Sequence, residues 1–148
     1  MSRKPSEIYT TNDWGFLAQP KVEGQWFERK AHPPSHLPSR LRDFVYERIA
    51  HTLCGFANSN PDIGGLLVIG IGDTGELHGI DRHATDYVNI LLSYADFLDG
   101  PTPEHKLVDC TRNDGAPDHL VFIYTPFLPS GLHAQLTVDA MFVVVIRL

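Results

Sequence analysis

One stretch, residues 53–80, constrains the fold more than any other part of the chain. It reads LCGFANSNPDIGGLLVIGIGDTGELHGI and passes from the end of an amphipathic helix, through a turn, into an apolar strand over residues 66–71. Asp73-Thr74-Gly75 then leads toward a second strand. Gly75 suits the left-handed position of a tight hairpin turn, and Gly64 and Gly65 allow a positive φ or a close backbone approach. The stretch therefore predicts a helix, a loop and a hairpin.

The rest of the chain extends this pattern into an α+β domain. Hydrophobic periodicity and turn signals predict six further segments. They are a strand over 22–31, a helix over 40–57, a helix over 87–98, a hairpin of 105–111 with 119–125 around Asn113-Asp114-Gly115, and a strand over 138–147. We expect a mixed or antiparallel sheet of five to six strands with two helices packed against it.

The length favours a single domain. A chain of 148 residues with 43% hydrophobic and 20% charged residues can bury an independent core and is not disordered. We expect residues 1–22 to form an N-terminal arm anchored by a few apolar side chains, and residues 23–148 to form the domain. Cys54 and Cys110 offer no disulfide framework, so both are predicted to be small buried residues.

Net charge argues against a broad phosphate-binding surface. The formal charge is −6, divided into +2 over residues 1–50 and −8 over residues 51–148. An electropositive surface therefore has to come mostly from the N-terminal third. No apolar run is long enough to span a bilayer and no signal-peptide core is present, so we expect a cytoplasmic location.

A literal G-x-G-x-x-G occurs at Gly70-Ile71-Gly72-Asp73-Thr74-Gly75. A dinucleotide site requires those glycines to open a helix, whereas the next residues, Glu76-Leu-His-Gly-Ile80, favour a short strand. The chain also lacks G-x(4)-G-K-[ST]. We therefore expect no nucleotide cofactor.

The motifs around the glycines carry a family resemblance. Phe56-Ala57-Asn58 is followed by Gly64-Gly65, Gly70, Asp73, Gly75 and Gly79, and upstream EGQWFERK places Glu23, Glu28 and Lys30 in an E-x(4)-E-x-K pattern. Together they resemble the Schlafen-type AlbA domain, a divergent AAA-associated DNA-binding domain. The resemblance covers roughly residues 23–126.

The resemblance implies two functions. The first is a DNA- or RNA-binding module in which Arg29, Lys30, Arg40 and Arg42, with Gly64 and Gly65, meet a phosphate backbone. The second is a divalent-metal-dependent endoribonuclease, because nuclease-active Schlafen-type domains carry a Glu, Glu, Asp site.

In the nuclease alternative, Glu23, Glu28 and Asp73 are the ligands of Mg²⁺ or Mn²⁺, and Lys30 is a catalytic residue that stabilises charge. The odd spacing of Glu23 and Glu28 puts them on opposite faces of a straight strand, so sharing a site requires a bend near Gly24. Exposed strand-edge charges are the structural alternative. A protein-interaction module that keeps only the fold, and a homo-oligomer or protein partner, also stay open.

Overall fold

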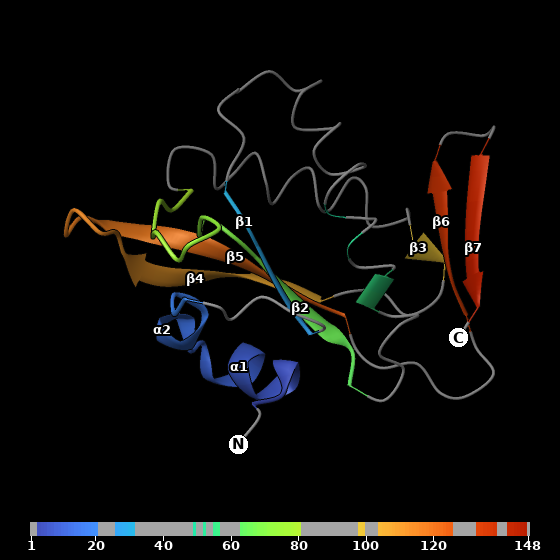
Figure 1. The fold of residues 1–148 in the computed structure, drawn as a ribbon, viewed down its shortest axis with the longest axis horizontal. Helices are drawn as coiled ribbons and strands as arrows, with labels where there is room; N and C mark the ends of the chain where they lie inside the picture. The colour runs from blue at the N-terminus through green and yellow to red at the C-terminus, as the bar shows by residue number, and fades with distance from the viewer. Residues whose placement is uncertain are drawn as a thin grey trace.

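The computed structural model describes residues 3–20, 26–31, 49, 52, 55–56, 63–80, 98–99, 104–125, 133–138 and 142–147. These residues form an α+β structure, which confirms the predicted class (Figure 1). Two short helices, α1 (Pro5–Thr11) and α2 (Trp14–Leu17), precede the strands.

The main sheet is mixed and has the strand order β1-β2-β5-β4. Its strands are β1 (Phe27–Lys30), β2 (Gly65–Ile69), β4 (Glu104–Thr111) and β5 (Pro117–Thr125). β1 runs parallel to β2, and the other two pairs are antiparallel. A parallel pair requires a crossover connection between its strands. Between β1 and β2, the described residues Thr52, Gly55 and Phe56 are helical, and they lie within the helix predicted over 40–57.

A second sheet has the order β3-β6-β7, formed by β3 (Leu98–Asp99), β6 (His133–Val138) and β7 (Phe142–Arg147). A single sheet of five to six strands is therefore not confirmed: the described strands divide into one sheet of four and one of three. The predicted strand over 138–147 is corrected as well. Val138 pairs with Phe142, so the chain reverses between them and the segment belongs to two antiparallel strands.

The core lies on both faces of the main sheet. The helices α1 and α2 lie beside the main sheet (Figure 1). Their side chains Ile8 and Leu17 pack in one cluster with Leu66, Val68 and Phe122 on one face of the sheet. On the other face, β2 and β5 present the fully buried side chains of Leu67, Ile69, Val121 and Ile123. Both faces of β2 are buried, which explains why its sequence is a continuous apolar run.

The two N-terminal helices lie within residues 1–22, for which we expect an N-terminal arm anchored by apolar side chains. Pro5 occupies the first turn of α1, and Asn12 ends that helix in a left-handed conformation at φ 56°. Asp13 caps α2 by accepting a hydrogen bond from the Phe16 amide at 3.1 Å.

The helix predicted over 87–98 lies outside the described residues except Leu98, which is in β3. Within the described part of the chain, no helix is both long enough and apolar enough to cross a membrane.

Candidate functional site

β1 sorts its side chains between two environments. Phe27 and Arg29 point into the core, whereas Glu28 and Lys30 are partly exposed on the opposite face. This alternation is the one that the pleat of a β-strand produces.

Arg29 is a core residue, and its predicted role on a phosphate-binding surface is corrected here. The residue is 2% exposed. Its Nη1 donates to the carbonyl oxygens of Leu17 at 3.1 Å and Gln19 at 2.6 Å, and its Nη2 donates to the Asp73 carbonyl at 2.6 Å. The guanidinium donates to three carbonyls and so joins the α2 region, β1 and the hairpin of residues 71–77, the glycine hairpin. It does not face solvent.

Glu28 and Lys30 form an ion pair on the other face of β1. Lys30 Nζ lies 3.5 Å from Glu28 Oε1, and the two side chains are 21% and 33% exposed respectively. Partial exposure makes the pair a small contribution to stability. Lys30 is thus the β1 cation that solvent reaches.

Asp73 lies in the turn of the glycine hairpin, and its side chain is exposed. Its carbonyl is held by Arg29, which leaves β1 on the face opposite to Glu28. The oxygen ligands of a divalent cation must converge, and the predicted metal site of Glu23, Glu28 and Asp73 stays a prediction.

Three of the predicted site residues, Glu23, Arg40 and Arg42, lie outside the described residues. Among the residues that are described, no group of three His, Cys, Asp or Glu side chains could hold a metal ion.

Gly64 and Gly65 are buried and serve packing. Gly64 has a φ of 77°, and a side chain at Gly65 would overlap the ring of Phe56. Only a residue without Cβ lets this helix approach β2 so closely. The contact of these glycines with a nucleic acid stays a prediction.

A cleft that the sequence analysis missed lies between the glycine hairpin and the β4–β5 turn. Its volume is about 480 Å³. Its lining residues are Glu76, Leu77, His78, Arg112, Asn113 and Asp114. Two hydrogen bonds join its walls: the Leu77 amide donates to Asn113 Oδ1 at 2.5 Å, and the Asn113 amide donates to the Leu77 carbonyl at 3.3 Å. The two hairpins thus form one polar end of the sheet.

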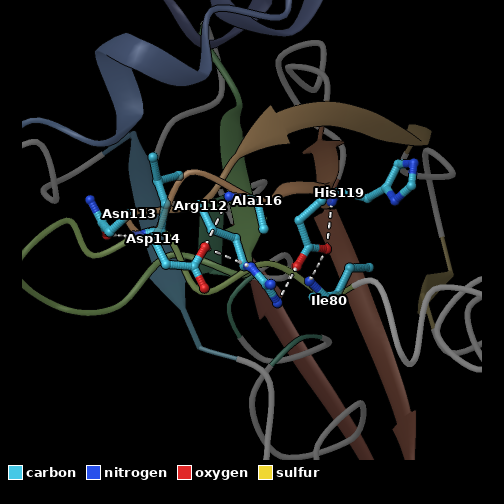
Figure 2. A network of polar contacts seen from close by, with 8 residues as sticks. Ile80, Arg112, Asn113, Asp114, Ala116 and His119 are labelled. Atoms are coloured by element: carbon cyan, nitrogen blue, oxygen red, sulfur yellow. Dashed lines mark hydrogen bonds and ion pairs between the residues drawn. The ribbon is translucent and has the colours of Figure 1, made fainter.

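Arg112 connects this cleft to a buried carboxylate. Its Nε lies 3.3 Å from Asp114 Oδ1, and its Nη1 lies 3.4 Å from Asp118 Oδ2 (Figure 2). Asp118 Oδ1 accepts hydrogen bonds from the amides of Ile80 at 3.1 Å and His119 at 2.6 Å. Asp118 is 4% exposed, and these donors stabilise its buried carboxylate.

A sequence signal for Asp118 did exist. It stands in the β5 alternation with Leu120 and Phe122, which are both buried, so the pattern places a carboxylate on an inward face. Such a carboxylate requires a cation, and Arg112 precedes the turn. The link to Ile80 could not be found in this way because it joins distant parts of the chain.

Cys110 lies inside the same region and is buried, as predicted. Burial, together with the nearby carboxylates of Asp118 and Asp109, raises the pKa of its thiol to about 11. The thiol therefore stays protonated at neutral pH, and it is not a nucleophile of this site.

Comparison with curated proteins gives no match. The family model described as "Schlafen, AlbA_2" matches residues 23–144. This match begins before β1, includes both hairpins and extends into β7. Since it spans most of the chain, the protein belongs to the Schlafen AlbA_2 family.

Proposed function

We propose that this chain is a nucleic-acid-binding module that contacts the phosphate backbone of RNA or DNA through the Lys30 face of β1. Family membership supports a module of this type, and charge and shape would dominate recognition.

The observation that carries the proposal is that the two cationic side chains of β1, Arg29 and Lys30, lie on opposite faces of the strand. Arg29 is buried and holds three carbonyls, whereas Lys30 lies on the opposite face, partly exposed. The next segment of the sequence, residues 32–48, contributes Arg40, Arg42 and Arg48. The N-terminal third, which carries the net positive charge, thus includes an accessible lysine followed by three arginines.

The hairpin end of the sheet is unsuitable for a polyanion. Asp73, Glu76 and Asp114 are exposed there, and Arg112 already contacts two carboxylates. Phosphate groups at this end would meet like charge. We therefore assign the contact to the Lys30 face and not to the glycine hairpin.

Binding of fluorescent RNA and DNA at several salt concentrations tests the proposal. Affinity should fall as salt rises, because bound lysine and arginine release counterions from the nucleic acid. Lys30→Gln should lower the salt slope by about 0.7 to 0.9, the value for one phosphate contact. Lys4→Gln is the matched control, since Lys4 is exposed at the N-cap of α1 and changes the net charge equally.

Two results would overturn the proposal. One is an affinity that does not change with salt. The other is an equal loss in the Lys30 and Lys4 variants, which would show that only net charge matters.

Metal-dependent cleavage of RNA stays a prediction, because Glu23 is outside the described residues. The Glu28→Gln variant distinguishes nucleic-acid binding from RNA cleavage, because the two functions predict different results for it. In a binding module this change removes the anion beside Lys30 and should leave or raise affinity. In a nuclease it should abolish cleavage of a structured RNA in Mn²⁺, so loss of a Mn²⁺-dependent cleavage would favour the enzyme.

A further inference from the structure

β4 ends the main sheet on one side. Its eight residues pair with β5 along their whole length, and among the described strands its other edge has no neighbour. The backbone amide and carbonyl groups on such an edge can pair with another strand. The side chains along the edge then determine which strand fits.

One face of β4 carries His105, which is partly buried, and Leu107 and Asp109, which are exposed. Leu107 is 41% exposed and is the one large hydrophobic side chain found exposed in the described part of the chain. Asp109 lies 3.1 Å from Nε2 of His119, and its side chain is 94% exposed. An apolar residue is thus flanked by a histidine and a carboxylate at equal spacing.

On the other face of β4, the side chains of Lys106, Val108 and Cys110 do not prevent another strand from pairing with the edge. Val108 and Cys110 are buried. Lys106 lies over the ring of Tyr9, 4.1 Å from its centroid, and donates to the Tyr9 carbonyl. A lysine on an edge strand usually prevents pairing, but this one is turned inward onto α1.

We propose that two copies of this chain associate through β4, pairing antiparallel about a two-fold axis at Leu107. In this register Leu107 meets Leu107 of the partner subunit, and His105 meets the partner's Asp109. Two-fold symmetry repeats the second contact, so two His105–Asp109 contacts, each beside the Asp109–His119 pair of one copy, flank one apolar centre.

Other registers are less favourable. Side chains that face each other must lie on the same face of the continuous sheet, so the register can change only in steps that keep this alignment. One such step places Lys106 against the partner's Lys106, and the opposite step places Leu107 against the partner's Asp109. Only the register centred on Leu107 matches apolar with apolar and acid with base.

A second copy suits this edge better than an unrelated peptide because the pattern is self-complementary. His105 and Asp109 lie equally far from Leu107 along the strand, which is what a two-fold axis requires. An unrelated strand would have to present the same order by chance.

Oxidative cross-linking tests the register directly. Directly opposed Cβ atoms lie about 4.5 to 5.5 Å apart, so Leu107→Cys should form a disulfide-linked dimer on mild oxidation. His105→Cys is the matched control, because position 105 is offset from its symmetry mate by roughly 13 Å along the strand. Wild-type protein oxidised in parallel accounts for Cys54 and Cys110.

Sedimentation velocity over a wide concentration range provides an independent measurement. Wild type and Leu107→Ile should associate reversibly, whereas Leu107→Lys should stay monomeric because two ammonium groups would meet at the axis. Thermal melts show whether each variant is folded. A wild-type monomer at every concentration, or equal cross-linking at positions 105 and 107, would overturn the proposal.

Discussion

The two hairpins at the polar end of the sheet share one backbone design. In the first, the Gly72 amide donates to the Glu76 carbonyl and the Gly75 amide donates to the Gly72 carbonyl. In the second, the Arg112 amide donates to the Ala116 carbonyl and the Gly115 amide donates to the Arg112 carbonyl. Each three-residue loop ends in a glycine of positive φ, 98° at Gly75 and 87° at Gly115.

Their surroundings differ completely. A side chain at Gly75 would overlap the Ala18 carbonyl oxygen and approach the Arg29 guanidinium, whereas a side chain at Gly115 would meet nothing within 4 Å. The first turn is packed against the α2 region, and the second is open to solvent. The comparison teaches that local sequence determines the turn, while tertiary packing determines whether the turn supports the core.

We expect the largest loss of stability from a substitution at Arg29, because this side chain holds the first turn in place. Arg29→Met leaves the carbonyls of Leu17, Gln19 and Asp73 without this donor, and we expect a loss of about 3 to 5 kcal/mol in the free energy of unfolding. Chemical denaturation measures the loss. Lys30→Met, which changes a partly exposed side chain of β1, should change stability by less than about 0.5 kcal/mol.

A small effect of Arg29→Met, similar to that of Lys30→Met, would contradict this account. It would mean that other donors replace the guanidinium and that the first hairpin does not depend on β1.

The two glycines give a matched pair with a smaller effect. Gly115→Ala should cost about 1 to 2 kcal/mol, because only the left-handed backbone opposes a side chain there. Gly75→Ala adds overlap with the Ala18 carbonyl, so its loss should rise to about 3 kcal/mol. Urea titrations of both variants measure the difference. Equal losses would show that the packing of the first turn contributes nothing.

The hairpins and the facing of β1 were predictable because their signals are local. Gly75 and Gly115 mark left-handed turn positions, and the alternation of Phe27, Glu28 and Arg29 follows from the pleat. The helices α1 and α2 were not predictable. They have seven and four residues, too few for a periodic apolar stripe, and burial of Ile8 and Leu17 against the sheet stabilises them.

The candidate site was less predictable than the fold. Arginine is seldom fully buried, so a sequence pattern assigns Arg29 to the surface. Its burial depends on carbonyls 10, 12 and 44 residues away, brought together by the fold. The cleft between the hairpins depends in the same way on the pairing of Leu77 with Asn113, which lie 36 residues apart.

The two turns also differ in the side chains that form their hydrogen bonds, and we expect the smallest effect from changing these side chains. In the first, the Thr74 hydroxyl and amide donate to the Glu76 carboxylate. In the second, Asp114 itself is the acceptor: its carboxylate accepts from the Ala116 amide at 3.0 Å, and this bond, with Arg112, holds the pKa of Asp114 below its ordinary value of 3.8. The ionised form is therefore favoured by the folded state.

The sign of the pH dependence follows from that lowered pKa. The contribution of Asp114 is complete above the ordinary value of the unfolded chain and is lost as pH falls below about 4 through the folded pKa. Asp114→Asn keeps an oxygen that can accept from Ala116, so it should remove this acid sensitivity while preserving the turn. An NMR titration of the Asp114 carboxyl measures the shift, and titration at or above 3.8 would show that the open turn does not stabilise the charge.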